Sequence, residues 1–338
     1  MNITRIGIDL AKQVFQLHGV DRHGKVLVRK QLRRAQMLAY FGKLTPCLVG
    51  MEACGSAHYW ARELGRLGHD VRLMAPQFVK PYVKRGKNDA NDAEAICEAV
   101  SRPNMRFVTV KTVEQQVMQA EHRIRARLIK TRTALSNEIR GLLAEFGIVV
   151  PPSLGQLRRA LPELLEDGEN GLLGHFRMLL AELAEELRSL DDRLKIYDVR
   201  LAQHARADDR VKRLLAVEGI GPVSASALVA AVGDGKQFGK GRDLAAWLGL
   251  TPREHSSGGK QRLGGISKQG DKYVRMLLIH GARAAMNAAV NKGDPRSRWV
   301  ISLAARRNKN IATVALANKN ARIAWAILSR GEDYRVSV

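Results

Sequence analysis

The chain has 338 residues and a formal net charge of +23, which is enough length for two domains and a connecting element. A charge of this size exceeds what solubility requires and indicates a long polyanionic partner such as DNA or RNA. No stretch approaches the ~20 apolar residues of a membrane-spanning helix, and neither a signal peptide nor a disulfide or zinc pattern is recognisable. We therefore expect a cytoplasmic protein with no membrane partner.

The first hundred residues alternate between strand and helix patterns. The predicted elements are strands over 3–9, 13–20, 25–32, 47–52 and 71–74, and helices over 34–43, 57–67 and 90–100. Three consecutive strands followed by alternating helices and strands are typical of an α/β domain with a mixed sheet. Ribonuclease-H-like nuclease domains have this order of elements.

Four carboxylates stand at positions that a two-metal nuclease needs. Asp9 and Glu52 each end an apolar strand, where an acid is costly to bury unless a cation is present. Asp89 and Asp92 are three residues apart, which places both on one face of a helix. Carboxylate oxygens are preferred ligands of Mg²⁺, and two such ions can activate a phosphodiester. Helix capping explains Asp89 or Asp92 only singly, and Glu94 is a weaker rival to Asp92.

The middle of the chain is predicted to be helical. Apolar residues between 113 and 146 recur at steps of three, four and seven, which predicts a long amphipathic helix that carries cations on its other faces. The apolar positions of this helix are Val117, Ile124, Leu128, Leu135, Ile139, Leu142 and Phe146. A second stripe over 180–197 alternates steps of three and four and suits a coiled-coil seam. The stripe fits either an intramolecular helical hairpin or a coil that joins subunits.

A second globular unit is predicted to begin near residue 205. Gly219-Ile220-Gly221-Pro222 stands between two helical segments and resembles the turn of a helix–hairpin–helix module, whose backbone N–H groups can meet a phosphate. A plain turn between helices fits equally well. The last part, 251–330, holds sixteen Lys and Arg against three acids. Within it, 252–265 is too glycine-rich for a helix and is interpreted as a mobile loop that presents hydroxyls and cations.

The motifs together resemble the DEDD transposases of insertion sequences, the family whose recombinase is guided by a bridge RNA. The resemblance covers nearly the whole chain and rests on the order and number of its motifs. The motifs are Gly7-Ile8-Asp9-Leu10-Ala11-Lys12, Gly50-Met51-Glu52, Lys87-Asn88-Asp89-Ala90-Asn91-Asp92-Ala93, Gly219-Ile220-Gly221-Pro222, Leu248-Gly249-Leu250-Thr251-Pro252 and 256–275.

The resemblance implies a RuvC-like DEDD catalytic domain over 1–110, a helical coiled-coil linker over 111–204, and a mostly α-helical transposase domain over 205–338. By motif match the catalytic acids are Asp9, Glu52, Asp89 and Asp92, which would bind Mg²⁺ or Mn²⁺. The nucleophile is Ser256, with Ser257 as its near rival and Ser267 as a distant one. In the family this serine is understood to attack DNA and form a covalent phosphoserine.

The implied partners are donor and target DNA, the bridge RNA, and further copies of the chain in a dimer or tetramer. The residues expected to contact nucleic acid are Arg123, Arg127, Lys130, Gly219, Gly221, Lys260, Arg262, Lys268, Lys272 and Arg275. The alternative function is a RuvC-like, metal-dependent, structure-selective endonuclease or nucleic-acid-binding protein without serine chemistry.

Overall fold

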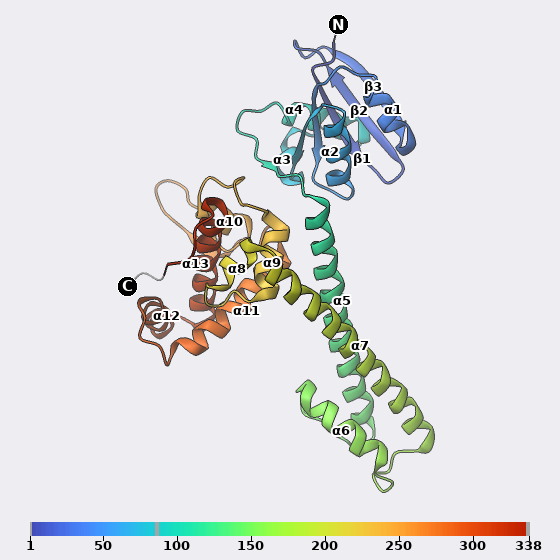
Figure 1. The fold of residues 1–338 in the computed structure, drawn as a ribbon, viewed down its shortest axis with the longest axis vertical. Coiled ribbons are helices and arrows are strands. Elements are labelled where there is room, and N and C mark those ends of the chain that lie inside the picture. Colours follow the sequence, from blue (N-terminus) through green and yellow to red (C-terminus); the bar gives the residue numbers. More distant parts are fainter. Residues whose placement is uncertain (1, 85–87, 336–338) are drawn as a thin grey trace. The chain divides into compact units, whose positions relative to one another are not determined.

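The computed structural model describes residues 2–84 and 88–335, and the chain divides between Val113 and Glu114 into two compact units (Figure 1). The predicted division of the chain at 110 and 204 stays a prediction. Among the described residues, no helix is both long and apolar enough to cross a membrane.

The N-terminal unit is a six-stranded sheet with helices on both faces. Its strands are β1 Arg5–Leu10, β2 Val14–Val20, β3 Val26–Arg33, β4 Leu48–Glu52, β5 Asp70–Met74 and β6 Phe107–Val108. Its helices are η1 Arg34–Gln36, α1 Met37–Phe41, α2 Ala57–Arg66, α3 Pro76–Val79, η2 Lys80–Tyr82 and α4 Asp89–Ala99. The strand order is β3-β2-β1-β4-β5-β6, with β1, β4 and β5 parallel and the other pairs antiparallel. The predicted mixed sheet is confirmed, and β6 was not predicted.

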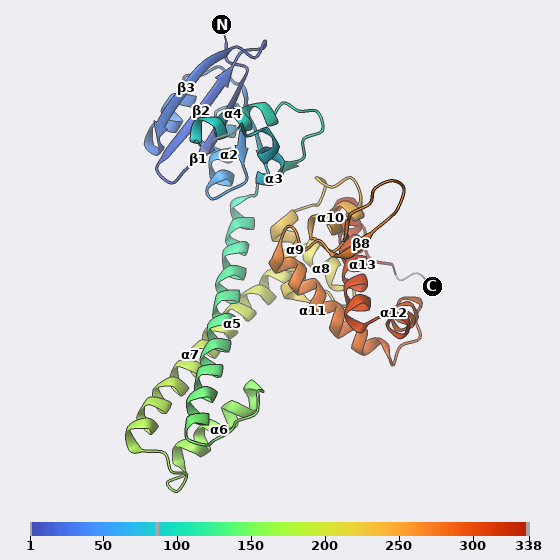
Figure 2. The ribbon, with the colours of Figure 1, turned by 180° about the vertical axis from the view of Figure 1, so that it is seen from behind.

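Alternate residues of β1 face the two layers of this unit, because side chains along a strand point to opposite faces. Ile6 and Ile8 are fully buried in a core that also holds Phe41 of α1 and Trp60 of α2. Residues 7 and 9 therefore face the other layer, where α4 lies. Figures 1 and 2 show α2 and α4 on opposite sides of the sheet.

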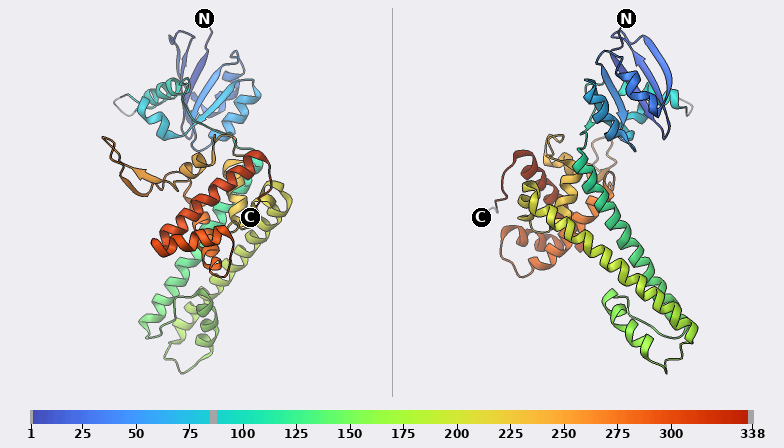
Figure 3. Two further views of the ribbon diagram at one scale, coloured as in Figure 1. Left: turned by 90° about the vertical axis from the view of Figure 1, so that its left-hand side faces the viewer. Right: turned by 45° about the vertical axis from the view of Figure 1, so that its right-hand side comes forward.

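The C-terminal unit begins with a long helical hairpin. Helix α5 (Val113–Glu145), helix α6 (Leu154–Glu166) and helix α7 (Gly174–Ala207) share one apolar core (Figure 3). The leucines of the predicted seam, Leu180, Leu187, Leu190 and Leu194, are buried in that core against α5. Arg132 of α5 also pairs with Asp191 of α7 at 3.0 Å. The seam is therefore covered within a single chain.

The predicted apolar stripe of α5 is correct in its middle and wrong at its ends. Leu128, Leu135 and Ile139 are buried as expected, whereas Val117 is half exposed. Near the C-terminal end Leu143 is fully buried and Leu142 is 36% exposed, so Leu143 takes the core position. The helix closes at Glu145, which leaves Phe146 outside it. A straight helix drifts from a strict seven-residue repeat, and this drift moves the buried face by one residue.

The remainder of the unit is a helical bundle with one small sheet. Its helices are α8 Asp209–Leu215, α9 Pro222–Val232, α10 Gly241–Trp247, α11 Lys272–Ala289, α12 Pro295–Arg306 and α13 Lys309–Arg330. Strands β7 (Pro252–Glu254) and β8 (Leu263–Ile266) pair antiparallel. The segment predicted as a mobile loop is thus a β-hairpin. Its strands escaped prediction because exposed strands of three and four residues give almost no periodic signal.

Candidate active site

Asp9 and Glu52 lie at the carboxyl ends of two neighbouring parallel strands. The register of β1 and β4 pairs Ile8 with Met51, so that the next pair in register is Asp9 and Glu52. Both side chains are partly buried. The sheet topology therefore brings these two acids together on the face that α4 covers.

Two glycines allow α4 to lie against the sheet on that face. A Cβ atom at Gly7 would stand 2.2 Å from the carbonyl oxygen of Ala93, and one at Gly50 would stand 2.8 Å from Cβ of Val100. Contacts this short are possible only for glycine. Gly7 and Gly50 each precede a strand-end acid by two residues and share its face. The glycines of both motifs therefore place α4 directly beside Asp9 and Glu52.

The first turn of α4 carries the other two acids. Asn88 is the N-cap, and its side chain accepts a hydrogen bond from the N–H of Ala90 at 2.7 Å. Asp89 and Asp92 are therefore not capping residues, although the positive end of the helix dipole favours their charge. Lys87, which begins this motif, lies outside the described residues.

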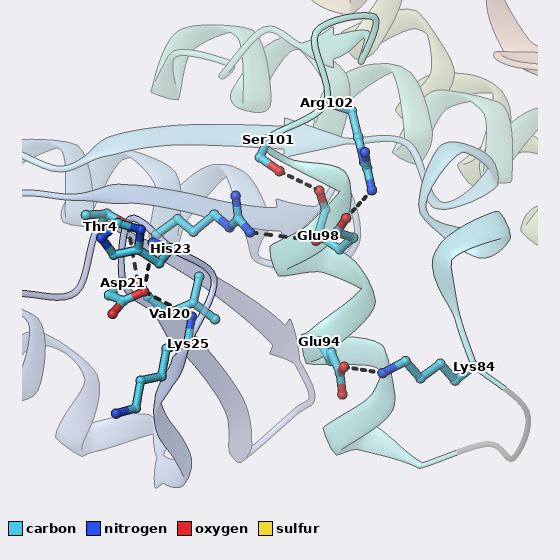
Figure 4. Close-up of polar contacts among 11 residues, drawn as sticks. Thr4, Val20, Asp21, His23, Lys25, Lys84, Glu94, Glu98, Ser101 and Arg102 are labelled. Carbon is cyan, nitrogen blue, oxygen red and sulfur yellow. Dashed lines mark hydrogen bonds and ion pairs between the residues drawn. The ribbon is translucent and has the colours of Figure 1, made fainter.

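Glu94, the rival to Asp92, is engaged elsewhere. Its carboxylate pairs with Lys84 and lies 3.8 Å from Arg29, and the hydrogen bond from Lys84 lowers the pKa of Glu94. Figure 4 shows Glu94 directed toward Lys84, one turn of α4 away from Glu98. These contacts favour Asp92 over Glu94 as the fourth acid.

The electrostatics join the four acids into one cluster. Burial raises the pKa of Asp9, and the charges of Asp89 and Asp92 raise it further. Burial also raises the pKa of Glu52, with added contributions from Asp9 and Asp92. Nearby negative charges disfavour the ionised forms of Asp9 and Glu52. A bound cation would offset this repulsion.

A divalent cation fits the chemistry of this donor set, because all four side chains offer carboxylate oxygens. Across residues 2–84 and 88–335, however, no three His, Cys, Asp or Glu side chains converge closely enough to hold a metal. The four carboxylates thus interact electrostatically with one another but do not form a closed ligand shell.

Ser256 lies just beyond β7, in the connection between the two strands of the hairpin. Its hydroxyl donates a hydrogen bond to Oε1 of Glu254 at 2.7 Å and accepts one from the N–H of Arg262 at 3.2 Å. The side chain is exposed. The expected serine is therefore held in one orientation by its own hairpin.

The turn of this hairpin runs from Ser257 to Lys260, whose N–H donates to the Ser257 carbonyl at 3.0 Å. Gly258 and Gly259 have φ of +56° and +75°, as the two central positions of a type I′ turn require. The paired glycines thus fix the turn, whereas the sequence suggested that they make a loop mobile.

The base of the hairpin is clamped by close backbone contacts. A Cβ atom at Gly249 would stand 2.3 Å from the carbonyl oxygen of Gln269, and one at Gly270 would stand 1.8 Å from that of Trp247. Arg275 is 7% exposed and donates to the carbonyls of Leu248 and Gln269 at 2.9 and 2.7 Å. The guanidinium of Arg275 thus has backbone partners at the base of the hairpin, and its expected contact with phosphate stays a prediction.

The other residues expected to contact nucleic acid lie mostly at the surface. The side chains of Arg123, Arg127 and Lys130 on α5, and of Lys260, Arg262, Lys268 and Lys272 near the hairpin, are exposed. The neighbours of the first group, Arg125 and Arg132, are paired with Asp198 and Asp191 of α7. The exposed cations of α5 therefore remain open to solvent on one face.

The turn between α8 and α9 packs tightly. Gly219 has φ of +84°, and a Cβ atom there would stand 2.8 Å from the carbonyl oxygen of Gly281 in α11. Gly221 is exposed and has open space around its α-carbon. Close packing accounts for Gly219, and phosphate contact at this turn stays a prediction.

Glu254 is the residue that sequence reasoning missed. In the sequence it is one of three acids in a basic segment, and the interpretation of 252–265 as a loop gives it no particular neighbour. Only His255 separates Glu254 from Ser256, and in a strand the side chains at i and i+2 lie on one face. Prediction of the strand would have revealed the pair.

Comparison with known proteins agrees with this arrangement. Residues 6–148 match a transposase family model of the DEDD type from IS110 elements, and residues 211–298 match the transposase IS116/IS110/IS902 family. The first match contains the four acids, and the second contains the serine hairpin.

Three full-length relatives are similar to the chain. A probable family 20 transposase of Pseudomonas aeruginosa is 60% identical over 99% of both chains. The transposase for insertion sequence element IS1111A of Coxiella burnetii is 47% identical over 99% of this chain and 92% of its own length. The transposase for insertion sequence element IS1328 of Yersinia enterocolitica is 42% identical over 98% of each.

A DEDD domain implies a divalent metal, and a transposase binds DNA. Both agree with a carboxylate cluster short of positive charge in a strongly cationic chain. The chain belongs to the IS110/IS1111 family of insertion-sequence transposases, with a DEDD N-terminal domain and a C-terminal domain of the IS116/IS110/IS902 type, and it carries out phosphoryl transfer on DNA.

Proposed function

We propose that this transposase cuts and rejoins DNA through a serine nucleophile, Ser256, assisted by a metal-dependent site at Asp9, Glu52, Asp89 and Asp92. Attack by the serine oxygen on a DNA phosphate forms a protein–DNA ester. This ester retains the energy of the broken phosphodiester, so strands can exchange and rejoin without an external energy source. A hydrolytic nuclease loses that energy to water.

The observation that carries the proposal is the hydrogen bonding of the Ser256 hydroxyl. A serine needs a neighbouring group to become a nucleophile, and Ser256 donates to a carboxylate at 2.7 Å. Lys260 and Arg262 lie on the same hairpin and supply positive charge for a pentacoordinate phosphate. Ser267 is less suitable, because its hydroxyl accepts from the N–H of Gln269 in its own loop.

Mg²⁺ or Mn²⁺ is the cation that we assign to the four acids. Both ions accept carboxylate oxygens and leave positions open for phosphate. Such an ion supplies positive charge to the phosphate during its displacement. Asp9 is central among the ligands, because its charge is linked to those of Glu52, Asp89 and Asp92.

Guidance by a bridge RNA is supported by the distribution of cations. Arg123, Arg127 and Lys130 lie at steps of four and three on one exposed face of α5, where they can neutralise phosphates of a nucleic acid. Aromatic residues make up only 5% of the chain, so stacking on bases has little support. Base pairing to RNA is therefore the source that we propose for target choice.

Oligomerisation is supported by apolar side chains at the tip of the helical hairpin. Val149 is 84% exposed, Leu173 is 70% exposed and Met178 is 58% exposed. All three belong to the ends and connections of α5, α6 and α7, and exposed apolar surface of this kind is typical of protein contacts. Since the 180–197 seam is already covered by α5, this tip is the surface that we propose for contact between copies in a dimer or tetramer.

The test is a search for the covalent adduct. Full-length protein is purified from a host that carries the whole element, and the co-purifying RNA is sequenced. The complex is incubated with donor and target DNA, denatured, and mapped by mass spectrometry. We expect a DNA adduct on Ser256 that is lost in Ser256→Ala, with nucleic-acid binding nearly unchanged.

One outcome would change the residue in the proposal, and another would change its chemistry. An adduct on Ser257 would keep the chemistry and change the residue. Normal recombination by both Ser256→Ala and Ser257→Ala would leave a metal-dependent, structure-selective endonuclease in place of a serine recombinase.

A further inference from the structure

The Glu254 carboxylate is the group nearest to the Ser256 hydroxyl proton. We propose that Glu254 is the general base that accepts this proton when Ser256 attacks DNA. The inference rests on the proposed serine chemistry and adds a second catalytic residue to it. Its basis is the 2.7 Å hydrogen bond from Ser256 Oγ to Oε1 of Glu254, which is within the reach that direct proton transfer needs.

The hydrogen bonds of Ser256 leave one lone pair free for attack. A serine hydroxyl has one proton and two lone pairs. The proton is directed to Glu254, and one lone pair accepts from the N–H of Arg262 at 3.2 Å. The second lone pair is open to solvent, because the side chain is exposed. This is the arrangement that a nucleophile needs before substrate arrives.

The other acids of this basic segment have structural functions. Asp271 caps α11 by accepting from the N–H groups of Tyr273 and Val274, and Asp294 caps α12 in the same way. Glu254 caps no helix, and within the described residues it forms no ion pair, although the segment 251–330 holds sixteen Lys and Arg. The carboxylate of Glu254 is therefore available to accept the hydrogen bond from Ser256.

The hairpin holds the two side chains in register. The N–H of His255 donates to the Arg262 carbonyl at 3.0 Å, and Glu254 pairs with Leu263 across the strands. These backbone bonds fix residues 254 and 256 on one side of the ribbon. Neither side chain needs to rearrange before proton transfer, which reduces the entropic cost of the step.

The step conserves atoms and charge. A bond forms between Ser256 Oγ and phosphorus, and the bond from phosphorus to the departing sugar oxygen breaks. The Ser256 proton passes to Glu254, and the departing oxygen leaves as a hydroxyl after it takes a proton from water. Glu254 then releases its proton to solvent. In rejoining, the oxygen of the incoming hydroxyl bonds to phosphorus and its proton passes to water, while the bond from phosphorus to Ser256 Oγ breaks. Glu254, which has regained a proton from solvent, gives that proton to Ser256 Oγ.

The experiment measures single-turnover formation of the DNA adduct by the full chain with its RNA. Glu254→Gln keeps an oxygen that can accept the serine hydrogen bond but is not a base. We expect adduct formation to slow by about 10²-fold or more, with DNA and RNA affinity unchanged. The matched control is Glu185→Gln, which removes an exposed carboxylate from α7 and its 2.9 Å pair with Arg188.

A second variant separates base catalysis from positioning. Glu254→Ala leaves space beside Ser256, and we expect added formate to restore part of its rate while leaving wild type unchanged. A residue that only positions the hairpin cannot be replaced by a free carboxylate.

The possible results are distinct. Wild-type rates in Glu254→Gln would overturn the inference, and so would a slow Glu254→Ala that formate does not accelerate. In both cases a wild-type adduct on Ser256 would leave the proposed function standing. Absence of that adduct in wild type would instead remove the proposed function itself.

Discussion

The two candidate centres of this transposase are built in opposite ways. The four acids lie on β1, β4 and α4, which are held together by tertiary packing in the N-terminal unit. Ser256 stands on an exposed two-stranded hairpin and is positioned by hydrogen bonds within fifteen residues of chain. The first centre depends on distant parts of the sequence, and the second depends almost wholly on local geometry.

Glycine has a different function in each centre. Gly7 and Gly50 are required because α4 leaves no room for a Cβ atom. Gly258 and Gly259 have nothing within 4 Å of the Cβ position and are required only for their positive φ. Substitution should therefore damage the fold in one unit and a single turn in the other.

The largest effect is expected for Asp9→Asn, which removes the acid that is linked to all the others. DNA cleavage and adduct formation should fall by on the order of 10³-fold, because a bound metal contributes several kcal/mol to phosphoryl transfer. Asp70→Asn, which breaks an exposed pair with Arg72, is the control and should retain activity. Full activity of the Asp9→Asn variant, or of wild type in EDTA, would exclude the four-acid site.

The same Asp9→Asn variant should be more stable than wild type without metal. The folded-state pKa of Asp9 is raised, so the native state holds its proton more tightly than the unfolded state. Stability is then lost as pH rises from the unfolded pKa through the raised folded value. In thermal melts with EDTA, the Asp9→Asn variant should have a higher melting temperature than wild type at pH 7. This difference should shrink as the pH falls toward about 4.

Gly7→Ala should destabilise the N-terminal unit by about 3 kcal/mol or more, since the added carbon forces α4 away from the sheet. Urea denaturation followed by near-ultraviolet circular dichroism would measure the change. Gly65→Ala is the control, because nothing lies within 4 Å of its Cβ position. Equal stability of the two variants would contradict the packing of α4 described here.

Gly258→Ala should strain only the turn, by about 1–2 kcal/mol, because an L residue is unfavourable at φ of +56°. We expect adduct formation to slow by roughly 10-fold with no change in melting temperature. Gly265→Ala in β8 also has open space and lacks a positive φ, so its rate should stay near wild type. Loss of global stability in Gly258→Ala would show that the hairpin belongs to the core.

The smallest effect concerns His122, whose ring nitrogens lie 3.1 Å from the hydroxyls of Tyr273 and Ser226. Burial lowers the pKa of His122 to about 4. The unfolded state therefore binds the proton first, and stability is lost as pH falls from about 6.5 toward 4. His122→Gln should reduce the difference in urea midpoint between pH 7 and pH 5. Exposed His280→Gln should leave it unchanged.

Much of the N-terminal centre was predictable from sequence because its signals are strong and local. Apolar runs that end in Asp9 and Glu52 predicted two strands and their acids, and the spacing of Asp89 and Asp92 predicted one helix face. The topology that joins them came from resemblance, since no single pattern predicts that α4 packs on Gly7. No sequence signal predicted that the four side chains would lie too far apart to form a closed ligand shell.

The hairpin was harder to predict because paired glycines occur both in flexible loops and in tight turns. Gly258-Gly259 fits both a flexible loop and a type I′ turn, and the flanking strands are too short and exposed to decide. Glu254 was missed for this reason. The two carbonyl partners of Arg275 had no sequence signal either, because only tertiary structure brings them together.

The contact between Gly219 and Gly281 fixes α11 against the turn between α8 and α9. Backbone touches backbone there, with a Cβ at Gly281 standing 1.9 Å from the Gly219 carbonyl oxygen. Helix α11 extends from this contact to Arg275, whose guanidinium donates hydrogen bonds to two carbonyls at the base of the hairpin. The N–H of Ser267 donates to the Thr251 carbonyl at 2.8 Å, where the two strands of the hairpin meet the bundle. A substitution that displaces α11 at Gly281 should therefore also displace the base of the hairpin that carries Ser256.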